Sequence, residues 1–188
     1  KENTEFYLIN SNEDGFKRIN QILKDRQNID ALHLIGHGSA GQILFGNAFL
    51  NNETIDNYKS TLTSIGQSLT TSGDILFYGC NVASTEQGEI LIKKISEITK
   101  ADIAASDDLT GKGGDWELEK KFGLIGKEEL EVKNYNHALG SLSTSGVLSG
   151  SGVTHIDSNV TMMNSGNVGL GNSGAYATVG SDFGLAVE

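Results

Sequence analysis

The ten residues Leu32–Gly41, LHLIGHGSAG, contain two overlapping motifs. Gly36, Gly38 and Gly41 match GxGxxG, the pattern of dinucleotide-binding turns. His37 and Gly38 also follow an apolar run. This pattern is typical of a catalytic histidine at the end of a buried strand. The residues on either side of this stretch decide between the two interpretations.

A dinucleotide site requires that the glycine turn open a helix, because the pyrophosphate binds at the helix N-terminus. Residues 42–51, QILFGNAFLN, instead alternate as in a strand. The acidic residues at the expected distance, Glu53 and Asp56, lie at the start of a predicted helix. The GxGxxG match is therefore interpreted as accidental. The nucleophile elbow GxSxG fails as well, because His37 occupies the place of its first glycine.

A second apolar run, DILFYGCNVAS over residues 74–84, places Cys80 just after a buried strand and directly after a glycine. Active sites of open parallel sheets form at the carboxyl ends of neighbouring strands. If the strands before His37 and Cys80 are neighbours, the two side chains meet there. A thiol beside an imidazole can act as a nucleophile, and the imidazole can protonate the leaving amine. The N–H groups of Gly38 and Cys80 could then form an oxyanion hole.

Strand and helix patterns alternate along the chain, which predicts an α/β fold: a mostly parallel sheet with helices on both faces. Ser11 or Asn12 is expected to cap the first helix. Strands are predicted at 5–10, 31–37, 73–80 and 101–108, helices at 11–27, 52–69 and 85–100, and hairpin-like pairs at 41–51 and 115–126.

Charge and composition exclude several classes of function. The 188 residues carry a net charge of −10, which argues against nucleic acid as a partner. There is no apolar run of the roughly 20 residues that a membrane span needs, and no signal peptide is visible. The first residue, Lys1, suggests an internal fragment of a longer chain. Cys80 is the only cysteine, so no intrachain disulfide can form.

The distribution of charge predicts two regions. Every Lys and Arg lies at or before Lys133, and only three charged residues follow Gly140. Residues 1–137 are expected to form the compact domain. Residues 138–188, rich in Gly, Ser and Asn, are expected to be a linker or the start of a β-rich adhesive region.

Three blocks of sequence carry a family resemblance. HLIGHG and ILFYGC resemble the paired His-Gly and strand-end Cys of the caspase-like (clan CD) cysteine peptidases. Residues 30–51, 73–89 and 99–119 together resemble a domain of unknown function found in very large bacterial surface adhesins. The resemblance covers about residues 5–133. The adhesin domain usually has one more strand and a helix before residue 5, so either the sheet here is expected to lack an edge or the chain is expected to start at a cut.

The resemblance implies roles for particular residues. His37 is the general acid–base, Cys80 is the nucleophile, and Gly38 and Cys80 provide the oxyanion hole. It implies no metal or organic cofactor, with calcium left open as an activator. It also implies a larger protein that is secreted or displayed on the surface of a bacterium.

Further residues near the predicted crevice are candidates for substrate binding. Tyr78 is two residues before Cys80 and faces the same side of the strand, as a pocket wall or as packing. Ser106, Asp107 and Asp108 end the predicted strand 101–108. The two carboxylates could receive a basic substrate side chain, or could lie in a solvated loop.

Other candidates are weaker. His33 and His37 share a strand face and could bind a metal, but no third ligand is evident, so a hydrogen-bonded histidine is favoured. The carboxylates of residues 107–115 could bind calcium, although their spacing does not match an EF-hand. Trp116 and Leu118 are expected in the core, and His137 and His155 are interpreted as incidental.

The sequence therefore predicts a cysteine endopeptidase that acts on a peptide or protein substrate, its own chain included. Self-cleavage is expected between about Lys133 and Gly150, after Lys133 if the pocket is acidic and after a residue such as Leu139 if it is not. The alternative is a catalytically inactive caspase-like module with a structural or targeting role in an adhesin.

Overall fold

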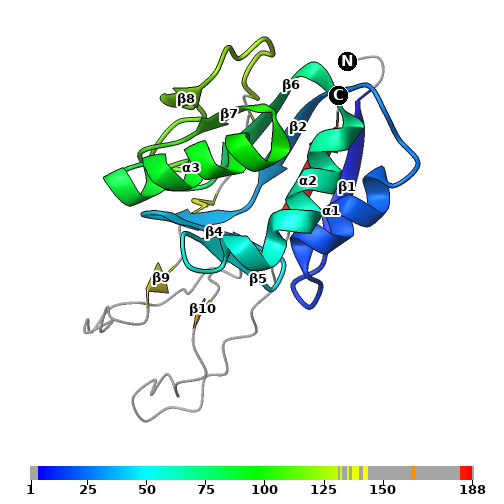
Figure 1. Cartoon of the computed structure of the whole chain (residues 1–188). Coiled ribbons are helices and arrows are strands. Elements are labelled where there is room, and N and C mark those ends of the chain that lie inside the picture. The colour runs from blue at the N-terminus through cyan, green and yellow to red at the C-terminus, as the bar shows by residue number, and fades with distance from the viewer. Residues whose placement is uncertain are drawn as a thin grey trace, which may run out of the picture.

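The computed structural model describes residues 4–130, 132, 135 and 137–139, and the backbone of residues 142–143, 162–163 and 183–187. Its main sheet has six strands in the order β1-β11-β2-β6-β7-β8 (Figure 1). The neighbours β2, β6 and β7 run parallel, and the flanking strands are antiparallel. The strands are β1 (Glu5–Ile9), β2 (Ile29–Ile35), β6 (Leu69–Tyr78), β7 (Asp102–Ala105), β8 (Lys120–Phe122) and β11 (Phe183–Val187). The predicted α/β class is confirmed.

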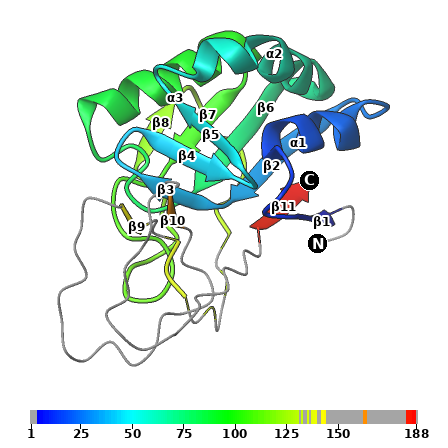
Figure 2. The same cartoon turned by 90° about the horizontal axis from the view of Figure 1, so that it is seen from below.

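The helices are α1 (Gly15–Leu23), the short 3-10 helix η1 (Ile55–Tyr58), α2 (Lys59–Ser68) and α3 (Glu86–Thr99). The α-helices lie together on one side of the sheet (Figure 2). Their apolar side chains share one buried cluster with Leu32, Ile75 and Phe77 of the sheet. The described helices thus cover one face of the sheet. The sequence had predicted helices on both faces.

The opposite face of the sheet is covered by loops. Side chains alternate along β6, so Ile75 and Phe77 face the helices while Leu76 and Tyr78 face the loops. The loop-side cluster also includes Leu118 and Leu139. The loop-covered face therefore brings together residues that are far apart in the sequence.

A second, three-stranded antiparallel sheet follows β2. It consists of β3 (His37–Ser39), β4 (Gln42–Phe45) and β5 (Ala48–Asn51). The predicted hairpin is confirmed, and Gly46 makes its turn at a φ of +61°. Because a strand and not a helix follows Gly41, the GxGxxG match has no helix N-terminus to bind a pyrophosphate.

Two local predictions were wrong. Asp14, not Ser11 or Asn12, caps α1 by accepting from the N–H of Lys17 at 3.1 Å. The predicted hairpin over 115–126 contains one short strand, β8, which pairs with β7.

The C-terminal strand β11 lies between β1 and β2. Two-residue strands β9 (Leu142–Ser143) and β10 (Met162–Met163) pair in parallel.

No helix in the described part of the chain is both long and apolar enough to cross a membrane. The position of the domain boundary at residue 137 stays a prediction. Lys133, Gly150 and His155 lie outside the described residues.

Candidate active site

His37 and Cys80 stand at the carboxyl ends of two neighbouring parallel strands. The last registered pair of β2 and β6 is Ile35 with Tyr78, and each candidate lies two residues beyond it. The N–H of Gly36 extends the pairing by donating to the Tyr78 carbonyl at 3.0 Å. His37 begins β3, and Cys80 begins the turn before α3. Both side chains are buried, with 4% and 0% of their surface exposed.

The backbones of Gly38 and Cys80 are packed against each other. A Cβ atom on Gly38 would lie 2.8 Å from the Cys80 carbonyl oxygen and 2.5 Å from Cγ2 of Val82. Real Cβ atoms essentially never approach other atoms this closely. Only glycine therefore fits at position 38 without a shift of its neighbours.

The two predicted oxyanion donors point at one oxygen atom. The N–H of Gly38 donates to the carbonyl of Leu139 at 3.1 Å, and the N–H of Cys80 donates to the same carbonyl at 3.4 Å. Pairs of N–H groups that converge on one carbonyl oxygen are the arrangement that stabilises negative charge on that oxygen. The carbonyl comes from Leu139, 59 positions after Cys80 in the printed sequence.

Residues 137–139 lie alongside residues 110–112 as an added strand. The Leu139 N–H donates to the Thr110 carbonyl at 3.0 Å, and the Lys112 N–H donates to the His137 carbonyl at 2.9 Å. Gly111 and Ala138 form an antiparallel bridge between these bonds. Extended peptides commonly bind to proteins through this pattern of main-chain hydrogen bonds.

Gly111 permits the close approach of this strand. Its φ is +96°, and a Cβ there would lie 2.4 Å from the His137 carbonyl oxygen. The sequence analysis did not identify residues 110–112 as a docking edge. The glycine at position 111 in the loop GKGG was the available signal, but the sequence alone does not reveal which segment approaches it.

The Cys80 thiol is held between backbone groups of Thr110. The Thr110 N–H donates to Sγ at 3.2 Å, and the thiol donates to the Thr110 carbonyl at 3.5 Å. Burial raises the pKa of the thiol, while the N–H groups of Thr110, Leu139 and Cys80 itself oppose the rise. The carboxylate of Asp108 raises the pKa further. The thiol form is thus favoured while residues 137–139 cover it.

The Leu139 side chain is 2% exposed and packs in the apolar cluster on the loop-covered face of the sheet, called the Leu139 pocket below. Apolar neighbours of this kind favour an aliphatic group. The fully buried members of the pocket, besides Leu139, are Ala31, Leu76, Tyr78, Cys80, Ala104 and Leu118.

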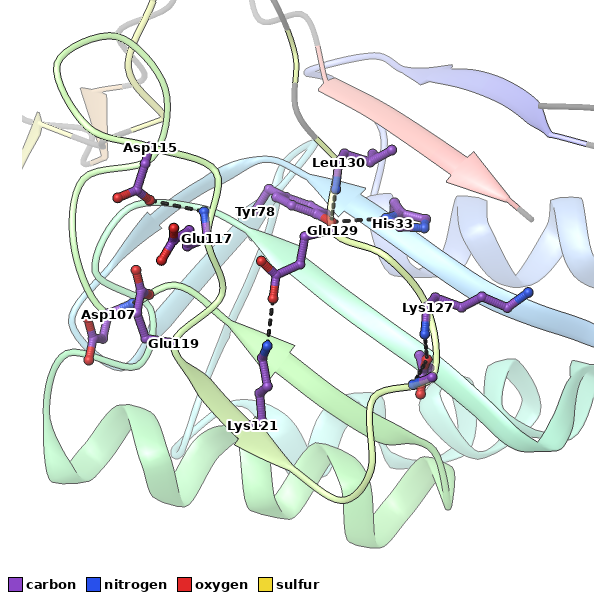
Figure 3. A network of polar contacts seen from close by, with 12 residues as sticks. His33, Tyr78, Asp107, Asp115, Glu117, Glu119, Lys121, Lys127, Glu129 and Leu130 are labelled. Atoms are coloured by element: carbon purple, nitrogen blue, oxygen red, sulfur yellow. Dashed lines mark hydrogen bonds and ion pairs between the residues drawn. The ribbon is translucent and has the colours of Figure 1, made fainter.

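Tyr78 lines this pocket with its ring and makes polar contacts with its hydroxyl group. These polar contacts, to His33 and Leu130, are called the clamp below. Its hydroxyl lies 3.1 Å from Nδ1 of His33 and accepts from the N–H of Leu130 at 2.8 Å (Figure 3). The rings of Tyr78 and His33 stack with centroids 5.8 Å apart. The favoured interpretation of His33 as a hydrogen-bonded histidine is confirmed. The clamp joins the loop after β8 to β6.

We expect Tyr78→Phe to lower the free energy of unfolding by about 0.5–1.5 kcal/mol, because the partly buried Leu130 N–H loses its acceptor. Urea denaturation measures the change. An unaltered free energy of unfolding would contradict the clamp and leave Tyr78 as a pocket wall only.

Ser106 stabilises a turn. Its side chain accepts from the N–H of Asp108 at 3.2 Å and donates to the Asp108 carbonyl at 3.3 Å. The Asp107 carboxylate lies 3.7 Å from Nζ of Lys120, and the Asp108 side chain is exposed. Substrate-binding roles for Ser106, Asp107 and Asp108 stay predictions.

One acidic group lies beside this turn. Carboxylate oxygens of Asp108, Asp115 and Glu119 lie within 4.8 Å of one another, and all three residues are exposed. Partial burial, then the charges of Asp115 and Asp107, raise the pKa of Asp108. Figure 3 shows Asp115 and Glu119 on the same loop as Asp107. Among the described residues this is the only group of at least three metal-ligating side chains, and neither His33 nor His37 belongs to it.

The fold and this site define a mixed α/β domain whose His and Cys follow adjacent parallel strands, with two N–H groups aimed at one carbonyl. The chain belongs to the family described as domain of unknown function DUF4347, whose model matches residues 1–139. No curated protein and no solved structure matches the chain.

Proposed function

We propose that this domain is a caspase-like cysteine endopeptidase that cleaves its own polypeptide, with Cys80 as nucleophile and His37 as general acid–base. The observation that carries the proposal is the pair of hydrogen bonds from Gly38 and Cys80 to the Leu139 carbonyl. These are the two N–H groups that the resemblance to clan CD peptidases implies as oxyanion donors. The proposal is supported because both groups donate to one carbonyl of the same chain.

In the proposed reaction, the thiol proton passes to His37 and Cys80 Sγ attacks the bound carbonyl carbon. The oxygen becomes negatively charged and is stabilised by the N–H groups of Gly38 and Cys80. The C–N bond then breaks, and His37 returns the proton to the leaving amine. Water hydrolyses the thioester, which releases a carboxylate and restores the thiol.

The resemblance to adhesin domains supports a further part of the proposal. The domain would belong to a large protein that is secreted or displayed on the surface of a bacterium. Self-cleavage suits such a protein, because a tethered substrate has a high effective concentration and needs little affinity. The net charge of −10 is consistent with a protein substrate and no nucleic-acid partner.

One observation favours a second candidate, an inactive caspase-like module with a structural role. Cys80 is fully buried, and its N–H and thiol both have backbone partners. A side chain in such surroundings can serve packing alone. In that case residues 137–139 would close the fold permanently instead of forming a substrate.

The experiment that separates the two candidates follows the intact mass of the 188-residue chain beside its Cys80→Ala variant, across pH and with or without calcium. We expect the parent chain to split into two fragments while the variant keeps its full mass. Full mass in both proteins over days would refute self-cleavage. Equal splitting in both would assign the cut to another nucleophile.

A further inference from the structure

Resting on the proposed endopeptidase activity, we propose that the bond cut is Leu139–Gly140 and that the enzyme selects an aliphatic residue, leucine here, on the amino side of the cut. The substrate is then the segment ending in His137-Ala138-Leu139, bound as an added strand. This assignment replaces a range of cleavage positions with one bond and replaces a basic specificity with an apolar one.

The first support is the position of the carbonyl. In a peptidase the residue whose carbonyl lies in the oxyanion hole is the residue on the amino side of the cut. The N–H groups of Gly38 and Cys80 both donate to the Leu139 carbonyl. The N–H of Leu139 is also among the groups that favour the Cys80 thiolate, so the thiol lies beside the backbone of this residue.

The second support is the register of the added strand. Leu139 is anchored by its own N–H to Thr110, and His137 is anchored by its carbonyl to Lys112. Side chains of successive residues point to opposite sides, so a shift by one residue would take Leu139 out of its pocket. The two anchors and the pocket therefore agree on one register.

The third support is the chemistry of the pocket. Leu139 is 2% exposed and shares an apolar cluster with Leu76, Tyr78 and Leu118. A lysine ammonium among these apolar side chains would lose hydration that the leucine side chain does not need. Of the two carboxylates that were expected to receive such a group, Asp107 lies 3.7 Å from Nζ of Lys120, and Asp108 is exposed. The pocket thus discriminates against a basic residue.

The carboxyl side of the bond is consistent with this assignment. Gly140 follows Leu139, and Ser141 comes next. Neither residue has a bulky or branched side chain, so the leaving segment makes few steric demands. The match to the DUF4347 family also ends at Leu139.

The test uses mass spectrometry of the 188-residue chain and three variants. We expect the parent to yield a fragment of residues 1–139. Leu139→Lys should slow cleavage by about 100-fold or more, because the pocket rejects the ammonium. Gly140→Pro leaves the Leu139 side chain unchanged and should also block this cut. Leu124→Lys is the matched control. It introduces the same charge as Leu139→Lys, but at a residue that is 87% exposed.

The outcomes separate this assignment from the proposed function. Cleavage at a different bond that still requires Cys80 would overturn the Leu139–Gly140 assignment and keep the endopeptidase. Faster cleavage of Leu139→Lys would overturn the apolar specificity in favour of an acidic pocket. Absence of any Cys80-dependent cleavage would overturn the endopeptidase itself. Thermal unfolding of each variant identifies a loss of cleavage that is due to misfolding. If Leu139→Lys misfolds, the cleavage of Gly140→Pro tests whether Leu139–Gly140 is the bond that is cut.

Discussion

Replacement of His37 by alanine is expected to slow self-cleavage by about 10²–10⁴-fold, the usual contribution of a positioned general acid–base. His37 is 4% exposed and follows β2, the strand next to β6, which precedes Cys80. Without its imidazole, the leaving amine must depart unprotonated or take a proton from water. The measurement is the rate at which the full-length mass disappears.

Because His37 is buried, His37→Gln serves as a second variant that keeps a polar side chain of similar size. Both variants should unfold cooperatively near the parent temperature. His155→Ala is the matched histidine control and should cleave at the parent rate. Parent rates in both His37 variants would remove this residue from the mechanism.

Local patterns were sufficient to predict the two strands that precede His37 and Cys80. The apolar runs before Gly36 and Gly79 became β2 and β6, and their pairing places His37 and Cys80 at the same end of the sheet. Patterns of this kind work because alternation and burial act over a few neighbouring residues.

Contacts between distant segments were not predictable in the same way. The docking of residues 137–139 onto residues 110–112 depends on two loops that meet only in the folded chain. The acidic pocket was suggested by the two carboxylates of Asp107 and Asp108 at the end of the predicted strand 101–108. The apolar pocket around Leu139 is assembled from separate strands and loops, and no local pattern shows it.

Competing local signals account for the smaller errors. Ser11, Asn12 and Asp14 are all good helix caps, and the sequence does not rank them. The alternation within 115–126 resembles a hairpin, yet the segment forms one strand, Lys120–Phe122, which pairs with the edge of β7. Whether a segment pairs as a strand depends on a free edge of a neighbouring sheet as well as on its own alternation of apolar and polar residues.

Gly38→Ala is expected to slow self-cleavage by about 10²–10³-fold, the usual cost of losing one oxyanion donor. The new Cβ would lie 2.5 Å from Cγ2 of Val82 and 2.8 Å from the Cys80 carbonyl oxygen, so one backbone must move. Either movement separates the N–H groups of Gly38 and Cys80 from the Leu139 carbonyl. The measurement is again the rate of loss of the full-length mass, with thermal unfolding as a check on the fold.

The matched control for this prediction is Gly126→Ala. A Cβ at position 126 meets nothing closer than the Asp74 carboxylate at 3.8 Å, so the same substitution fits there. We expect this variant to cleave at the parent rate. A Gly38→Ala protein that folds and cleaves as fast as the parent would show that the hydrogen bond from Gly38 does not contribute to the reaction. The hydrogen bonds to the Leu139 carbonyl would then serve only to close the fold over Cys80.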